Sequence, residues 1–147
     1  MEQKIKQFLK SSIGWVLYIG FLVGLVLGVP KGLSYLLKTD YPMASITSGS
    51  MWPVLKKGDL IFIKGVNNKG EIQLDDIIVF QNEKGFTIHR VTKLDENTLV
   101  TKGDANNVSD KPIEYEDVIG ELLTFNKKPI RVPLLGMISV YINKNKM

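Results

Sequence analysis

Residues 77–91, Ile77-Ile78-Val79-Phe80-Gln81-Asn82-Glu83-Lys84-Gly85-Phe86-Thr87-Ile88-His89-Arg90-Val91, decide the fold. Both ends of this stretch are rich in β-branched and aromatic residues, a composition typical of strands. The Asn-Glu-Lys-Gly sequence between them is a turn signal. The stretch therefore predicts two antiparallel strands. Alternation places His89 and Val91 on one face of the second strand and Ile88 on the other.

The same pattern extends to both sides of this stretch. Further strand-like runs lie at 60–63, 98–101 and 118–125. Turn signals separate the runs at 67–70, 95–97 and 127–129. No stretch after residue 59 has a sustained helical period, and no internal repeat is evident. The sequence predicts a mainly β domain of antiparallel strands, built as a small, partly closed barrel or as two packed sheets.

An uncharged apolar segment precedes the β domain. Residues 13–29 carry no charge, and the apolar character continues to residue 37. A helix needs roughly 17–25 such residues to cross a bilayer. Aromatic residues suited to membrane interfaces lie near its two ends, at Trp15, Tyr18 and Tyr35. We expect a transmembrane helix; a cleaved signal peptide and a buried helix of a soluble protein are the alternatives.

The flanking charges predict the orientation of this segment. Three lysines precede it, at Lys4, Lys6 and Lys10. Two more lie at its other end, at Lys31 and Lys38. The positive-inside rule then favours a cytoplasmic N-terminus. We expect a cytoplasmic N-terminus at 1–12, a transmembrane anchor at 13–37 and an exported β domain at 38–147. The apolar tail at 133–142 is too short to span a bilayer, and the sequence leaves open whether it completes the sheet or rests at the membrane.

Composition excludes several classes of function. The 147 residues give room for one modest domain, and the absence of cysteine excludes disulfides and thiolate chemistry. A single histidine argues against a zinc site, and Ser109 stands where a calcium loop of EF-hand type requires glycine. The net charge of +4 is spread over scattered lysines and arginines, with no basic stripe for nucleic acid. We expect no metal, no cofactor and no nucleic acid.

A candidate nucleophile lies in the segment at 45–53, Ser-Ile-Thr-Ser-Gly-Ser-Met-Trp-Pro. Glycine permits backbone angles that other residues avoid, and Pro53 prevents a helix from crossing the turn. Such a loop can present a serine hydroxyl beside backbone amides, as acyl transfer requires. Turns rich in serine and glycine are common, so this segment alone does not establish catalysis.

The single histidine and two aspartates are candidates for the remaining roles. Histidine has an unperturbed pKa near 6.5, which suits a general base at neutral pH. His89 also fits a structural histidine in a hairpin. Asp104 and Asp110 fit either an Asx-rich surface turn or the carboxylate that orients the histidine in a serine hydrolase triad. Their spacing does not decide between them.

Several motifs, in order, resemble those of type I signal peptidases. They are Ser48-Gly49-Ser50-Met51-Trp52-Pro53, Lys57-Gly58-Asp59, Asp76-Ile77-Ile78, His89-Arg90-Val91, and Lys102-Gly103-Asp104-Ala105-Asn106-Asn107 followed by Asp110. The resemblance covers roughly residues 45–136. It is to the branch shared by archaea, the endoplasmic reticulum and SipW-like bacterial enzymes (peptidase family S26B). The main bacterial branch has a lysine base in the position of His89.

The resemblance implies a LexA-like antiparallel β fold and a role for each candidate. Ser50 matches the nucleophile and His89 the general base. Asp110 matches the triad acid and ranks ahead of Asp104, which matches an aspartate that supports the site. The oxyanion hole is expected to use the Ser50 backbone amide and the Ser48 hydroxyl.

The resemblance also implies the substrate and the surroundings. A membrane-bound serine endopeptidase of this family cleaves signal peptides from exported preproteins after small residues, with the catalytic domain on the exported side of the cell or endoplasmic-reticulum-type membrane. Substrate is expected to bind along Ser45, Ile46 and Thr47, and Met51 and Trp52 to meet the lipid headgroups. Preproteins, the bilayer and the secretion translocon are the expected partners. A self-cleaving repressor-type peptidase, which needs lysine at position 89, and a catalytically silent membrane adaptor are the alternatives.

Overall fold

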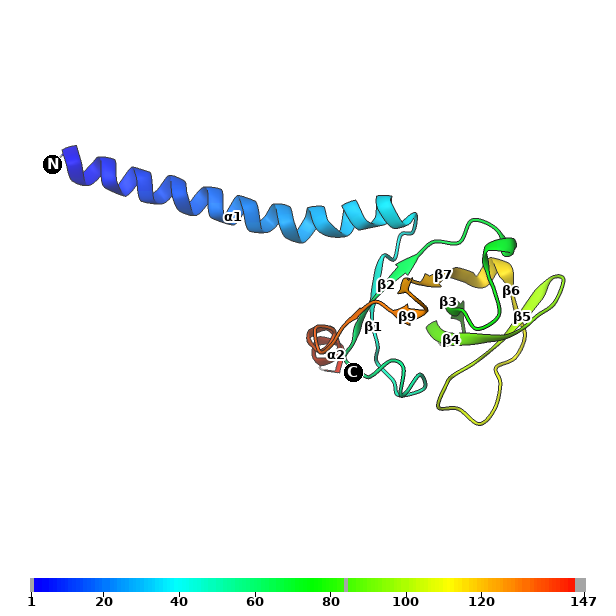
Figure 1. The fold of residues 1–147 in the computed structure, drawn as a ribbon. Coiled ribbons are helices and arrows are strands. Elements are labelled where there is room, and N and C mark those ends of the chain that lie inside the picture. The colour runs from blue at the N-terminus through cyan, green and yellow to red at the C-terminus, as the bar shows by residue number, and fades with distance from the viewer. Residues whose placement is uncertain (1, 84, 145–147) are drawn as a thin grey trace. The chain divides into compact units, whose positions relative to one another are not determined.

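The structure, a computed structural model, describes residues 2–83 and 85–144. Met1, Lys84 (part of the turn predicted at 82–85) and residues 145–147 of the predicted domain lie outside the described residues. The chain forms two compact units that divide between Leu36 and Leu37 (Figure 1). In chain order the helices and strands are α1 (Glu2–Leu37), β1 (Met43–Ser45), β2 (Leu60–Lys64), β3 (Ile77–Asn82), β4 (Gly85–Leu94), β5 (Thr98–Lys102), β6 (Ile113–Glu114), β7 (Val118–Leu122), β8 (Thr124–Phe125), β9 (Lys128–Pro129), β10 (Arg131–Val132) and α2 (Met137–Lys144).

The first unit contains the long helix α1 as far as Leu36. Its segment Ile13–Leu37 has a mean hydropathy of 2.1, and none of the residues in the apolar window is buried. At about 1.5 Å per residue, this segment is long enough for the roughly 30 Å hydrocarbon core of a bilayer. Pro30 lies inside the helix. A proline there removes one backbone donor, which membrane helices tolerate. By length and composition, α1 can therefore cross a membrane.

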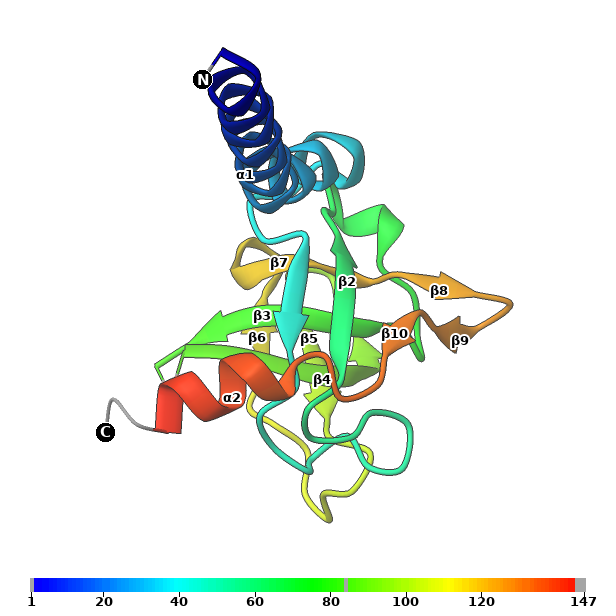
Figure 2. The same ribbon diagram turned by 90° about the vertical axis from the view of Figure 1, so that its left-hand side faces the viewer.

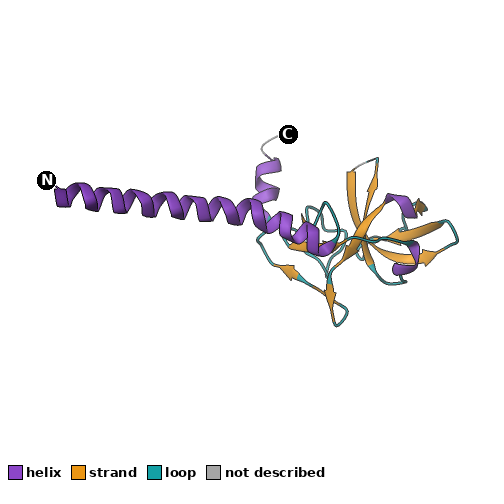
Figure 3. Ribbon diagram, turned by 90° about the horizontal axis from the view of Figure 1, so that it is seen from above, coloured by secondary structure: helices purple, strands orange, loops and turns teal. Residues whose placement is uncertain are grey.

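The second unit is built around one antiparallel sheet. Within the described residues, eight strands form it in the order β1-β2-β7-β3-β4-β5-β6, with β10 pairing with β2 as well. A separate pair, β8 and β9, is also antiparallel. Figure 3 shows how strands dominate this unit. The predicted mainly β, antiparallel fold is confirmed, and each predicted run of residues contains a strand.

Strand β3 explains why residues 77–80 are apolar without alternation. Ile77 and Val79 belong to one buried cluster, whereas Ile78 and Phe80 belong to another. Because successive side chains of a strand point to opposite faces, β3 is covered on both sides. Strand β4 pairs with β3 and places His89 opposite Ile78. The central strands thus fix the position of the histidine.

The C-terminal tail takes a form that the sequence leaves open. Residues Arg131 and Val132 extend the sheet as β10, opposite Ile61 and Leu60 of β2. The last described residues form the helix α2, which lies across β1 (Figure 2). A helical period is not visible in the sequence after residue 59, because an eight-residue helix offers only about two turns. The tail therefore contributes both a strand and a helix.

Candidate active site

Ser50 lies on a loop that joins β1 to β2, here named the nucleophile loop (residues 46–59). Two backbone hydrogen bonds close its base: the Gly58 N–H donates to the Ile46 carbonyl at 2.8 Å, and the Ile46 N–H donates to the Asp59 carbonyl at 2.9 Å. Met51 and Leu55 are 2% and 0% exposed and belong to the core cluster. The loop is therefore anchored at its base and by its own buried side chains.

The polar groups of Ser50 have distinct surroundings. Its Oγ lies 3.1 Å from the Ser48 Oγ. Its carbonyl accepts a hydrogen bond of 2.8 Å from the Ala105 N–H. Among the described residues, the Ser50 N–H has no hydrogen-bond acceptor. The loop thus leaves one backbone donor free beside a hydroxyl group.

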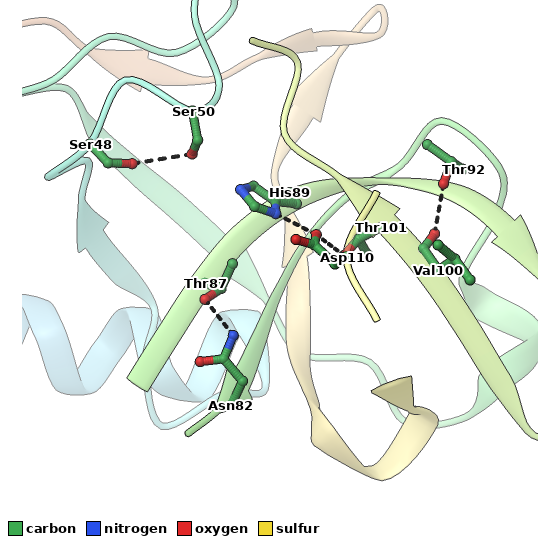
Figure 4. Close-up of polar contacts among 9 residues, drawn as sticks. All are labelled: Ser48, Ser50, Asn82, Thr87, His89, Thr92, Val100, Thr101 and Asp110. Atoms are coloured by element: carbon green, nitrogen blue, oxygen red, sulfur yellow. Dashed lines mark hydrogen bonds and ion pairs between the residues drawn. The ribbon is translucent and has the colours of Figure 1, made fainter. Parts of the chain in front are cut away.

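His89 lies on β4 and contacts Asp110. The histidine is 7% exposed, and its Nδ1 lies 2.6 Å from the Asp110 Oδ2. The same carboxylate oxygen accepts a hydrogen bond of 2.6 Å from the Thr101 Oγ1. The Asp110 N–H donates to the Thr101 carbonyl at 2.8 Å. In Figure 4 the Ser50 hydroxyl and the Asp110 carboxylate lie on opposite sides of the His89 ring.

Asp104 lies in the same loop as Asp110 but contacts Arg90 instead. The Arg90 Nε and Nη2 donate to the two Asp104 carboxylate oxygens, each at 2.8 Å. A third hydrogen bond of 2.7 Å runs from the Arg90 Nη1 to the Asp75 carbonyl. The hydrogen bond to Asp104 raises the pKa of the Arg90 guanidinium, although burial acts in the opposite direction. Arg90 is therefore a permanent cation that fixes Asp104, and it cannot act as a base.

Gly103 allows the two loops of the site to approach each other closely. A Cβ atom at this position would lie 2.8 Å from the Ser50 carbonyl oxygen and 2.7 Å from the Asn106 Nδ2. The neighbouring Ala105 N–H donates to that Ser50 carbonyl. Sequence reasoning assigned no role to Thr101, Gly103 or Ala105, although Gly103 and Ala105 lie within the motif at 102–107.

The residues expected to bind substrate fall into two groups. Ser45 ends β1 at the border of the sheet, and Thr47 is exposed. Ile46 is 4% exposed, and its N–H and carbonyl are bonded to residues 58–59. The side chain of Ile46 faces the core and its backbone faces the base of the loop, and its contact with substrate stays a prediction. Ser45 and Thr47 stay candidates.

The two residues expected at the membrane surface also differ. Met51 is 2% exposed and packs in the core cluster. The nucleophile loop folds this side chain inward, and the expected contact of Met51 with lipid headgroups stays a prediction. Trp52 is 59% exposed and stays a candidate for that contact.

A groove with a volume of about 1020 Å³ opens beside Asp110. Acidic residues from two segments line part of it, at Glu83, Glu114, Glu116 and Asp117. Among the described residues, no group of three or more histidine, cysteine or acidic side chains is arranged to hold a metal ion. The described residues of this site offer a serine hydroxyl, an imidazole bonded to a carboxylate, and a backbone N–H donor.

The sequence is similar to those of known proteins over most of the chain. A family model described as "Peptidase S24-like" matches residues 29–123. The chain is 31% identical over 143 residues to the signal peptidase complex catalytic subunit SEC11C of Homo sapiens, covering 87% of this chain and 71% of that protein. It is 29% identical over 133 residues to the catalytic subunit SEC11 of Lachancea thermotolerans, covering 79% and 74%. It is 31% identical over 131 residues to sec11 of Neurospora crassa, covering 78% and 72%.

Proposed function

We propose that Ser50, His89 and Asp110 are the catalytic triad of this chain, which belongs to the Peptidase S24-like family and to the type I signal peptidases of the endoplasmic-reticulum branch. The activity is signal-peptide cleavage by a membrane-associated serine peptidase. One observation carries the assignment of residues: Asp110 holds His89 at 2.6 Å through Nδ1, on the side of the ring away from Ser50. That arrangement leaves Nε2 to act on the serine.

The first half of the reaction acylates the serine. His89 Nε2 takes the proton from the Ser50 hydroxyl as its Oγ attacks the scissile carbonyl carbon. Asp110 stabilises the imidazolium that forms. Nε2 then gives its proton to the nitrogen of the leaving amine as the C–N bond breaks. The mature protein departs with a new N-terminus, and the signal peptide stays on Ser50 as an ester.

The second half releases the signal peptide. His89 takes a proton from water as the water oxygen attacks the ester carbonyl. The proton returns to the Ser50 oxygen as the C–O bond breaks, which regenerates the enzyme.

Two donors are suited to stabilise the oxyanion in both halves. The Ser50 N–H has no acceptor among the described residues, and the Ser48 hydroxyl lies 3.1 Å from the Ser50 Oγ. Donors placed before the reaction stabilise the developing charge without reorganisation. Removing one such donor typically lowers kcat by about 100- to 1000-fold.

The identity of residue 89 separates this chemistry from that of the repressor-type peptidases. A Ser/Lys mechanism requires a lysine that can lose its proton, and position 89 is a histidine. The neighbouring Arg90 stays charged in its ion pair with Asp104. His89 is thus the base that the site offers to Ser50.

Substrate is proposed to bind as an added strand beside β1. This strand stands at the end of the sheet order, paired with β2. The backbone of Ser45 and Thr47 supplies hydrogen bonds to an extended segment, and shallow pockets select the small residues that precede a signal-peptide cleavage site. Backbone pairing gives affinity without demanding a fixed sequence.

The membrane anchor gives this chemistry its location. We place α1 across the membrane over Ile13–Leu37, with the N-terminus cytoplasmic and the β domain on the exported side. Exported preproteins are the substrates, and Trp52 meets the headgroups. Because enzyme and substrate share one membrane, their effective concentration is high and weak intrinsic affinity suffices. Relatives are named as subunits of a signal peptidase complex, so companion subunits and the translocon are the proposed partners.

Cleavage of a preprotein in proteoliposomes tests the proposed function. The parent is expected to cut after a small-x-small site, identified by sequencing the new N-terminus. Ser50→Ala and His89→Ala are each expected to lower kcat by about 10⁴-fold or more, because triad members act as a unit.

A matched control is Ser139→Ala, an exposed serine on α2 outside the site, which is expected to keep parental activity. Full activity in Ser50→Ala would refute the assignment of the nucleophile. Cleavage at pH 5 at the rate seen at pH 7.5 would remove His89 from the role of base.

A further inference from the structure

The C-terminal segment contacts the base of the nucleophile loop. Residues 131–137 are here named the C-terminal clasp. The Arg131 Nη1 donates to the Asp59 Oδ2 at 2.6 Å. The Gly136 N–H donates to the Gly58 carbonyl at 2.9 Å. The clasp therefore binds the point where the nucleophile loop rejoins the sheet.

Asp59 connects the clasp to the inside of the loop. It is 3% exposed, and its Oδ2 also accepts a hydrogen bond of 2.9 Å from the Lys56 N–H. Within the described part of the chain, Arg131 is the cation paired with this carboxylate. A buried carboxylate is costly unless it is paired and hydrogen-bonded. Asp59 thus ties the turn at 56–59 to Arg131.

Two glycines allow the backbones to meet at this point. A Cβ atom on Gly136 would lie 2.7 Å from the Asp59 carbonyl oxygen and 2.9 Å from that of Gly58. Gly58 has a φ of +91°, and a Cβ atom there would overlap the Met137 side chain. A larger residue in place of either glycine would therefore force the clasp and the base of the loop apart.

A short, packed part of the nucleophile loop connects the base of the loop to Ser50. The Leu55 N–H donates to the Met51 carbonyl at 2.8 Å, and both side chains are buried. Met51 directly follows Ser50. If a change at the base displaces a catalytic group by about 1 Å, the rate can fall by about 100-fold.

Resting on the proposed function, we propose that Arg131 and Gly136 are positioning residues, which act through Asp59 and Gly58, respectively, to hold Ser50 in place for attack. They touch neither the triad nor the proposed substrate strand. Their loss is expected to lower kcat while leaving KM nearly constant, because substrate affinity resides along β1.

The test compares Arg131→Met, Arg131→Lys and Lys64→Met as full-length proteins in proteoliposomes. Lys64 is the matched control, because it also ion-pairs across the sheet, at 2.9 Å to Glu121, and lies outside the clasp. Arg131→Met is expected to lower kcat by about 10- to 100-fold with KM within about threefold. Arg131→Lys is expected to recover activity to within about fivefold, since a lysine can donate to the same oxygen. Lys64→Met is expected to stay within about twofold.

Amide hydrogen exchange supplies a readout that does not depend on activity. Exchange in residues 46–59 is expected to be faster in Arg131→Met and unchanged in Lys64→Met. If Arg131→Met does not fold, Gly136→Ala replaces it with the same expectations. Unchanged loop exchange, an unchanged kcat, or a KM effect alone would overturn the proposal. A parent that cleaves no preprotein refutes the proposed function instead, while loop exchange still decides whether the clasp holds the loop.

Discussion

His89 and Asp110 are held by the β-sheet, whereas Ser50 is held by a loop. His89 on β4 pairs with Ile78 on β3, and the Asp110 N–H donates to the Thr101 carbonyl on β5. Ser50 depends on contacts outside the strands, with Ala105 and with the base of the nucleophile loop. The acid–base half of the site is therefore set by strand register, and the nucleophile half by packing between loops. Substitutions that leave the strands intact should separate the two halves.

The largest contrast is expected between the two aspartates of one loop. Asp110→Asn is predicted to lower kcat by about 10³- to 10⁴-fold, because an amide neither stabilises the imidazolium nor fixes the required tautomer. Asp104→Asn is predicted to lower kcat by about tenfold or less, since Asp104 contacts Arg90 rather than His89. Steady-state cleavage of one preprotein by both variants measures the ratio.

Stability provides the control for this pair. Asp104→Asn weakens a partly buried ion pair and is expected to lower the free energy of unfolding by about 1–3 kcal/mol. Denaturant unfolding of both variants separates loss of fold from loss of chemistry. A larger kcat effect for Asp104→Asn, with the fold intact, would exchange the roles of the two residues.

A second prediction concerns the contact between the loops. Gly103→Ala places a methyl group against the Ser50 carbonyl, a backbone atom that can move only with the nucleophile. We expect kcat to fall by about 100-fold. Gly85→Ala is the comparison, because a Cβ atom there meets nothing within 4 Å, although its φ of +100° adds a backbone strain that Gly103→Ala does not have. Equal activity in the two variants would show that the loops do not need this close approach.

The pH dependence is expected to give a smaller, graded effect. A histidine base must be neutral to accept the serine proton, so kcat should fall as the pH is lowered. A profile from pH 5 to 8.5, with Lys64→Met measured alongside, checks this. A rate that stays constant to pH 5 would mean that another group accepts the serine proton.

Local sequence pattern predicted the centre of the fold. The two runs within residues 77–91 became β3 and β4, because a turn signal separates them, the apolar residues of β3 are buried on both faces, and Val91 of β4 is buried as well. The shorter strands β1 and β10 were not predicted. They hold three and two residues and form against opposite edges of β2, so their pairing depends on the tertiary structure.

The contacts within the site were harder to predict from the sequence than the strands were. Spacing could not separate Asp104 from Asp110, because the partner of each is fixed by folding and not by neighbours in the chain. Arg131 and Asp59 are 72 residues apart, a pairing that no local pattern indicates. Met51 follows a candidate catalytic serine, and only the path of the loop reveals that it is buried. The catalytic roles of Ser50, His89 and Asp110 stay predictions.

The most direct test of the central claim uses the fact that His89 is the single histidine of the chain. Proton and nitrogen-15 NMR of the imidazole, in protein without a histidine tag, reports its tautomer without further assignment. The account predicts that neutral His89 carries its proton on Nδ1, bonded to Asp110, and that Asp110→Asn abolishes this state while Asp104→Asn preserves it. A proton on Nε2 in the parent, or a tautomer unaffected by Asp110→Asn, would contradict the proposed roles of His89 and Asp110.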